Sequence, residues 1–171
     1  RREAAIRNLE RVKQSRDSGF TLRVPRNDDQ EQRKAQSMPQ TIHTGIKALI
    51  DEANAAIETV SAADAIKVVQ DPNIVIVDIR DPRELARDGK IPGAVHAPRG
   101  MLEFWVDPES PYYKDVFGSG KRFVLHCASG WRSALAAKAV QDMGLEGVSH
   151  IATGFKGWVE AGGPVERGSK G

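Results

Sequence analysis

The feature that most constrains the fold of this chain is a repeated alternation of short apolar runs with segments of helical composition. The clearest run is Ile74–Asp78 (IVIVD), which lies between turn-forming residues. A continuous apolar run of this length is typical of a strand buried on both faces, as in a parallel sheet. Three further strands are predicted at residues 94–97, 123–126 and 148–152. The alternation predicts an α/β layered fold with a mostly parallel sheet.

Segments with helical patterns lie before and between these strands. They are residues 42–57, the stretch from Ser61 to Pro72, and residues 82–87, 133–143 and 155–161. Ser61 followed by Asp64 resembles a capping arrangement, and Gly144 is a good C-terminal stop for the fourth helix. Residues 101–117 form an irregular excursion rich in aromatic side chains. No internal repeat is visible, and 171 residues are enough for one domain with a tail.

The domain is expected to span residues 39–171, with residues 1–38 as a charged N-terminal extension. The second half of this extension is polar and turn-prone, a composition that favours disorder. Met38 offers an alternative start, and in that case the extension would not be native. Residues 1–40 carry ten basic and six acidic side chains, so the net charge of +2 originates there. The remainder has a small acidic excess and no nucleic-acid-binding signature, so no nucleic-acid partner is expected.

Apolar runs in this sequence are all short. None approaches about 18 residues, so no transmembrane helix is predicted. The charged N-terminus lacks the apolar core of a secretory signal. We therefore expect a cytoplasmic protein with no membrane partner.

The chain has a single cysteine, Cys127, and this count excludes several kinds of site. One cysteine cannot form an intrachain disulfide or a zinc site built on several thiolates. His43, His96 and His150 show no metal-ligand spacing, so neither a metal nor another cofactor is expected. A lone cysteine is often only a small buried hydrophobe. Its surroundings must therefore decide its role.

Cys127 lies where a predicted buried strand ends, and a helix is expected to begin at Ser133. In an open α/β sheet, ligands bind in the crevice at the carboxyl ends of the strands. Backbone N–H groups of a short loop containing Gly130, together with a helix N-terminus, form an anion-binding cradle. Such a cradle favours the thiolate, and Arg132 and Ser133 can add positive charge and a hydroxyl donor. This order of elements alone leaves an inert structural cysteine and a nucleophile both open.

Four collinear blocks of this sequence resemble the rhodanese-like family, across roughly residues 59–167. They are Val77–Glu84, Gly89–Pro98, Cys127–Ser133, and Gly154–Trp158 with Ala161–Val165. The resemblance implies a three-layer fold, with a mostly parallel sheet of about five strands flanked by helices. It implies that Cys127 is the catalytic residue. The substrate-binding loop would then consist of Ala128, Ser129, Gly130, Trp131, Arg132 and Ser133.

The resemblance also implies sulfane-sulfur transfer through a persulfide on Cys127. The donor would be thiosulfate or a persulfide, and the acceptor cyanide or a thiol. A cysteine desulfurase or an acceptor protein is a further expected partner. Two residues depart from the family pattern: Lys90 replaces the commoner His, and Ala128 lacks a charged or hydrogen-bonding side chain. Ala128 weakens the case for thiosulfate as the natural donor, and Trp131 adds a bulky wall beside the loop.

Two alternatives to an active sulfurtransferase remain. The domain could serve as a non-catalytic sulfur carrier or docking module. It could also be a phosphatase or arsenate reductase, but enzymes of that kind on this fold use a longer Cys-x5-Arg loop. The shorter Cys-x4-Arg spacing from Cys127 to Arg132 fits sulfur better.

Three further residues are predicted to line the pocket. Asp78 ends a buried strand and is expected to accept hydrogen bonds from neighbouring loop N–H groups. Arg80 is expected to shape the electrostatics of the pocket. Arg99 follows a strand end and is expected either to lie on the rim with Glu103 or to form a plain surface salt bridge. His126 precedes Cys127 in a strand, so its side chain should point to the opposite face of the sheet, where it packs or caps.

Overall fold

The computed structural model describes residues 41–167 of the 171-residue chain. The expected N-terminal extension, residues 1–38, lies outside these residues, so its state remains a prediction. In the described part, no helix is both long enough and apolar enough to cross a membrane.

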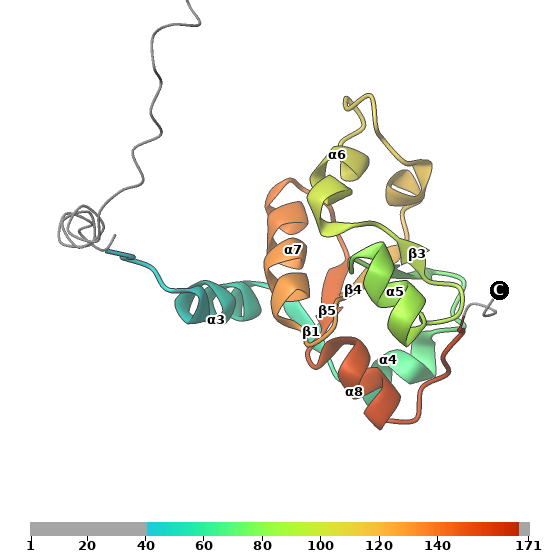
Figure 1. The fold of residues 1–171 in the computed structure, drawn as a ribbon. Coiled ribbons are helices and arrows are strands. Elements are labelled where there is room, and N and C mark those ends of the chain that lie inside the picture. The colour runs from blue at the N-terminus through green and yellow to red at the C-terminus, as the bar shows by residue number, and fades with distance from the viewer. Residues whose placement is uncertain (1–40, 168–171) are drawn as a thin grey trace, which may run out of the picture. The chain divides into compact units, whose positions relative to one another are not determined.

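A five-stranded sheet forms the centre of the domain, and all of its neighbouring strands run parallel. The spatial order is β1-β5-β4-β2-β3. The strands are β1 (Glu58–Val60), β2 (Ile74–Asp78), β3 (Val95–His96), β4 (Arg122–His126) and β5 (Val148–Ile151). The sheet and its flanking helices (Figure 1) confirm the predicted α/β fold class.

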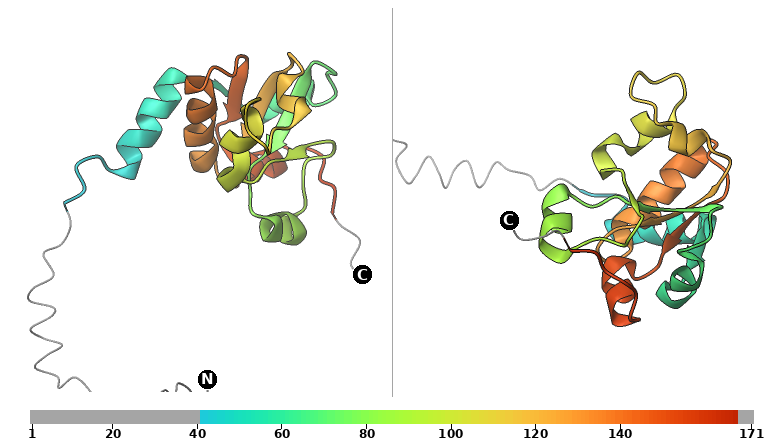
Figure 2. Two further views of the ribbon diagram at one scale, coloured as in Figure 1. Left: turned by 90° about the horizontal axis from the view of Figure 1, so that it is seen from above. Right: turned by 90° about the vertical axis from the view of Figure 1, so that its right-hand side faces the viewer.

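Helices cover both faces of this sheet (Figure 2). The α-helices are α3 (Ile46–Ala56), α4 (Ala62–Val68), α5 (Pro82–Asp88), α6 (Leu102–Val106), α7 (Trp131–Asp142) and α8 (Gly154–Glu160). Two 3-10 turns, η1 (Arg99–Met101) and η2 (Asp115–Gly118), flank α6 in the excursion. Buried residues of α3, α6 and α7 join one core cluster, and those of α4 and α8 join a second. The result is the expected three-layer arrangement.

Successive side chains along the central strands point alternately into the two core clusters. Val77 of β2 and Leu125 of β4 face the α7 side, whereas Ile76 and Val124 face the α8 side. All four side chains are buried, because helices cover both faces of a parallel sheet. Trp158 of α8, fully buried, anchors the second core. This packing fixes the carboxyl ends of β2 and β4 side by side.

Two helices begin two or more residues away from the start that the pattern predicts. The helix expected over 42–57 begins at Ile46, and the Ile46 side chain is exposed although it belongs to the apolar face. The helix expected from Ser133 begins at Trp131. The loop that follows Cys127 is therefore only Ala128–Gly130, two residues shorter than the helix prediction implied.

Strand β1 is absent from the predicted strands. It has three residues and follows α3 directly, with only Ile57 between them. A segment this short carries no alternating pattern of its own. It is a strand because its backbone pairs with β5, as in the register of Thr59 with His150.

Candidate functional site

The candidate site lies at the carboxyl ends of the two central strands. Asp78 ends β2 and pairs in register with His126, which ends β4. Cys127 follows immediately and is only 1% exposed. Its side chain belongs to the core on the α7 side of the sheet. The sulfur therefore lies at the sheet edge where ligands bind in open α/β folds.

Gly130 turns the chain from the loop into α7. Its φ of +92° lies in the left-handed region, and a Cβ placed there would overlap the carbonyl oxygen of Ala152. The Gly130 N–H donates to Cys127 Sγ at 3.2 Å. The sulfur is thus held at the N-terminus of a 12-residue helix, whose dipole favours a negative charge.

The first turn of α8 holds the other side of the loop. The N–H of Phe155 donates to the Cys127 carbonyl at 2.7 Å, and that of Lys156 donates to the Ala128 carbonyl at 3.0 Å. Gly154, with φ +58°, permits this approach, because a Cβ there would meet loop backbone atoms at 2.6–2.7 Å. In a trans peptide the N–H points opposite to the C=O. The N–H groups of Ala128 and Ser129 therefore point away from α8.

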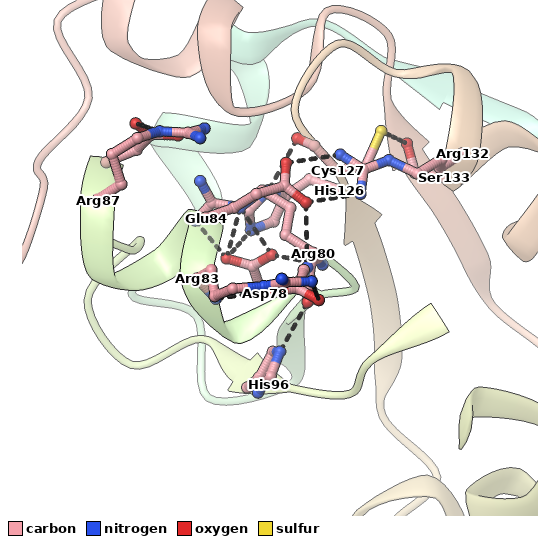
Figure 3. A network of polar contacts seen from close by, with 12 residues as sticks. Asp78, Arg80, Arg83, Glu84, Arg87, His96, His126, Cys127, Arg132 and Ser133 are labelled. Carbon is pink, nitrogen blue, oxygen red and sulfur yellow. Dashed lines mark hydrogen bonds and ion pairs between the residues drawn. The ribbon is translucent and has the colours of Figure 1, made fainter. Parts of the chain in front are cut away.

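Ser133 lies within the first turn of α7 and faces the sulfur (Figure 3). Its Oγ is 3.6 Å from Cys127 Sγ, 3.0 Å from the Gly130 carbonyl oxygen and 3.3 Å from His150 Nδ1. The other ring nitrogen of His150, Nε2, lies 3.2 Å from Thr59 Oγ1. A chain of polar groups thus runs from β1 through β5 to the sulfur.

His150 controls what Ser133 can donate. With the proton on Nδ1, His150 donates to Ser133 Oγ, and the single Ser133 hydroxyl proton remains for the sulfur or the Gly130 carbonyl. With the proton on Nε2, Ser133 donates to the ring instead. Burial lowers the pKa of His150 below its ordinary value of 6.5, and this outweighs the hydrogen bond with Gly130 that raises it. The ring is therefore neutral near pH 7, and the position of its one proton sets the direction of the chain.

Arg132 is engaged by a carboxylate. Its Nη1 and Nη2 each donate to one oxygen of Glu84 in α5, both at 2.7 Å (Figure 3). The Glu84 hydrogen bonds raise the pKa of Arg132, and the nearby Cys127 thiol adds to this. Arg132 in turn lowers the pKa of Glu84. The positive charge expected beside the sulfur is present, but a negative charge faces it.

Asp78 and Arg80 form a fully buried ion pair behind the site. Arg80 Nε donates to Asp78 Oδ1 at 2.9 Å, and Nη2 donates to Oδ2 at 2.6 Å. The Arg80 guanidinium also lies 4.0 Å from the centre of the Phe155 ring. Asp78 accepts the backbone N–H of Arg80, which is the loop hydrogen bond expected of it. The pair joins β2 to α8, the helix that holds the Cys127 loop.

His126 points to the face opposite Cys127, as its strand position predicts. Its ring stacks on Phe155, and its Nε2 lies 3.5 Å from Asp78 Oδ2. Burial lowers the pKa of His126 more than the Asp78 charge raises it. His126 is thus a neutral packing residue and not a partner of the Cys127 thiol.

The remaining predicted site residues lie farther out. Arg99 of η1 pairs with Glu103 of α6 at 2.6 Å on a partly exposed surface, which is the plain salt bridge that the sequence left open. The Trp131 side chain is 59% exposed. Ala128 borders a cleft of about 490 Å³, lined also by Arg87, Lys156, Val159 and other residues of α5 and α8. In residues 41–167, no three His, Cys, Asp or Glu side chains are grouped to hold a metal ion.

Sequence reasoning missed Glu84 and His150. The pattern Asp81-x-x-Glu84 is a capping box, and both of its hydrogen bonds are present at the start of α5. That local signal places Glu84 in the first turn after β2, at the correct sheet edge. His150 has no such signal, because its partner Ser133 lies 17 residues away in another element.

Comparisons with known proteins give the relatives of this chain. The chain is 29% identical over 92 residues to the Mus musculus thiosulfate sulfurtransferase/rhodanese-like domain-containing protein 3, covering 51% of this chain and 59% of that protein. It is 31% identical over 116 residues to the Saccharomyces cerevisiae thiosulfate:glutathione sulfurtransferase, covering 63% of this chain and 81% of that protein. The chain thus spans a little over half of the mouse relative.

One solved structure is more similar in sequence than these two relatives. It is a protein of unknown function from Rhodopseudomonas palustris, described as a possible tyrosine phosphatase, with 61% identity and a TM-score of 0.74. The match covers 75% of this chain and 99% of that one. Residues 61–161 also match the profile of the rhodanese-like domain. Because this match extends over more than half of the chain, the protein belongs to the rhodanese-like domain family.

Proposed function

We propose that this protein is a sulfurtransferase that carries sulfane sulfur as a persulfide on Cys127. The observation that carries the proposal is the placement of Cys127 Sγ at the N-terminus of α7, where the Gly130 N–H and the Ser133 hydroxyl face it. Backbone N–H groups at a helix N-terminus stabilise an anionic sulfur without any metal. Both the thiolate and the persulfide present such an anion.

The reaction divides into two half-reactions that balance. The Cys127 thiolate attacks the sulfane sulfur of a donor such as thiosulfate, a new S–S bond forms, and sulfite leaves with the electron pair of the broken bond. An acceptor then attacks the outer sulfur of the persulfide. Cyanide leaves as thiocyanate and regenerates the Cys127 thiolate, and a thiol acceptor leaves as its own persulfide. This is covalent catalysis, and ping-pong kinetics follow from it.

The names of two relatives support this chemistry. The yeast relative is a thiosulfate:glutathione sulfurtransferase, and the mouse relative is named for thiosulfate sulfurtransferase. By likeness to them, the partners we propose are a small sulfur donor and a thiol or cyanide acceptor. A cysteine desulfurase is a further candidate donor.

Intact-mass spectrometry tests the proposal directly. The reduced protein, incubated with thiosulfate or with a small persulfide, should gain the mass of one sulfur, and cyanide should remove it. Cys127→Ser should gain nothing. An adduct that forms but turns over very slowly with every small acceptor would identify a sulfur carrier instead of an enzyme. The absence of any adduct on the wild-type protein would overturn the proposal.

A phosphatase is the second candidate, because the Rhodopseudomonas palustris structure carries that description. A phosphate in the loop would bind the Arg132 side chain best through two parallel N–H groups, and Glu84 already takes the pair on Nη1 and Nη2. The three-residue loop between Cys127 and α7 also leaves less space than the Cys-x5-Arg spacing expected for phosphate. Hydrolysis of an aryl phosphate that disappears in Cys127→Ser would favour this second function.

A further inference from the structure

The Glu84–Arg132 pair places a carboxylate against the arginine in the first turn of α7, the helix whose N-terminus holds the candidate nucleophile. Glu84 Oε2 accepts both Arg132 Nη1 at 2.7 Å and the backbone N–H of Asp81 at 3.1 Å. The second oxygen accepts Arg132 Nη2 at 2.7 Å. The Glu84 side chain is only 19% exposed. Three donors and partial burial therefore hold this carboxylate in one position.

The same pair occupies part of the group that an anionic donor would use. A planar guanidinium binds an oxyanion best through two parallel N–H groups, and Glu84 already takes the pair on Nη1 and Nη2 of Arg132, which leaves the Nε side for a donor. A dianionic donor that enters must displace the carboxylate or approach against its charge. Ala128, next to the sulfur, offers no compensating positive or hydrogen-bonding side chain. A donor of low charge meets neither obstacle.

We propose that Glu84 is a specificity-determining residue that disfavours dianionic sulfur donors and so selects persulfides of low charge. This inference rests on the proposed sulfurtransfer at Cys127. It specifies the class of sulfur donor and names the residue that selects this class. Glu84 acts by holding Arg132 and by its own charge, and it takes no part in breaking or forming bonds.

Both donors transfer one sulfane sulfur to Cys127, and they differ in their leaving group. From a persulfide R–S–SH, the Cys127 thiolate takes the outer sulfur with its proton, and R–S⁻ leaves with the electron pair. The donor enters without charge, and the negative charge of the Cys127 thiolate leaves on R–S⁻. From thiosulfate, two negative charges must enter beside Glu84 and leave again as sulfite. The difference between the donors is therefore a charge difference at the entrance of the site, and removing the Glu84 charge should affect only the second.

The test is Glu84→Gln, measured with two donors. Gln keeps the size of the side chain and can still accept the Asp81 N–H, so the capping box of α5 is retained. We expect kcat/KM for thiosulfate to rise by about tenfold or more, because like charges brought together at a binding site disfavour association. We expect kcat/KM for the persulfide of a small uncharged thiol to change by less than about twofold, since no like charges meet there.

Glu58→Gln is the matched control. Glu58 also accepts an arginine through both oxygens, from Arg122 at 2.9 Å, but Arg122 begins β4 at the sheet edge opposite Cys127. This variant changes the net charge equally and should leave both donors unaffected. An equal rise in Glu58→Gln would show a general charge effect and overturn the inference.

The outcomes separate this inference from the proposed function. If the wild-type protein forms the adduct but Glu84→Gln leaves the ratio of the two donors unchanged, the role of Glu84 is wrong and sulfurtransfer stands. If no donor gives an adduct on either protein, both are wrong. Equal urea midpoints of the wild-type protein and Glu84→Gln would establish that any change in donor preference does not come from unfolding.

Discussion

The single hydroxyl proton of Ser133 has several possible hydrogen-bond acceptors. Its hydroxyl lies within reach of the sulfur, the Gly130 carbonyl and His150. A hydroxyl donates only one hydrogen bond at a time. When the sulfur is anionic, donation to it is favoured, because hydrogen bonds to charged groups are the strong ones. His150, with its proton on Nδ1, then donates a hydrogen bond to the Ser133 oxygen.

We therefore predict that Ser133→Ala slows persulfide formation. A hydrogen bond to a charged group contributes about 1.5–3 kcal/mol, so the rate of adduct formation should fall about tenfold or more. The measurement is the time course of adduct mass after mixing with the donor.

Ser149→Ala is the control for this prediction. Ser149 is equally buried and lies in β5, but its hydroxyl donates to the Phe123 carbonyl on the other face of the sheet. The rate for this variant should stay near that of the wild-type protein. A similar loss in both variants would mean that Ser133 acts through packing alone.

At this scale, local patterns predicted some of the site and not the rest. Cys127 and Ser133 became candidates because strand, loop and helix follow each other in sequence and because the resemblance to the rhodanese-like family covers this segment. Glu84 and Arg132 are 48 residues apart, and their pairing depends on how α5 and α7 are placed in space. The Asp81-x-x-Glu84 capping box is a local signal that could have placed Glu84 at the start of α5, but it does not reveal which residue Glu84 meets.

Among the elements, the turn from β4 into α7 depends on one backbone conformation. Gly130 has a positive φ and lies against the Ala152 carbonyl, so an alanine there meets both strain and overlap. We predict that Gly130→Ala lowers the free energy of unfolding by at least about 3 kcal/mol, at the upper end of single substitutions. Urea denaturation followed by far-UV circular dichroism measures this change.

Gly93→Ala separates the effect of backbone strain from the effect of overlap with a neighbouring group. Gly93 also has a positive φ, +75°, but an added Cβ there meets nothing within 4 Å. Conformational strain alone should cost about 1–2 kcal/mol. Equal losses in the two variants would show that the contact with Ala152 is unimportant.

Gly130 also explains why the start of α7 was misplaced. Sequence patterns identified the apolar strand β2 to the residue, because Ile74–Asp78 is bounded by turn formers. They placed the later helix two residues too far along, since a left-handed glycine can begin a helix at once and Trp131 carries no helix-start signal. Strand β1 was missed for a different reason. Its three residues are a strand only through pairing with β5.

Across the whole molecule, two buried histidines tie stability to pH. Burial lowers the pKa of both His126 and His150 from 6.5. Below pH 6.5 the unfolded chain binds these protons while the folded one does not, so the free energy of unfolding falls as pH falls. The contribution of the two histidines to the free energy of unfolding is fully retained above pH 6.5. Each histidine contributes at most about 1.4 kcal/mol per pH unit.

Urea unfolding at pH 7.5, 6.5 and 5.5 measures this dependence. His126→Gln should reduce the slope, because one of the two linked protons is removed. Carboxylates such as Glu84, whose pKa is lowered by Arg132, lose their contribution only at lower pH and do not interfere in this window. A free energy of unfolding that is constant from pH 7.5 to 5.5 would contradict the prediction.

The hydrogen bonds between α8 and the Cys127 loop have a consequence for hydrogen exchange. The first N–H groups of a helix have no partner within the helix and ordinarily exchange quickly with solvent deuterium. Those of Phe155 and Lys156 are bonded to the carbonyls of Cys127 and Ala128, so they should exchange slowly. Their protection reports whether the loop is closed, and it does so from a neighbouring helix. The state of the cysteine loop can thus be followed without modifying the cysteine.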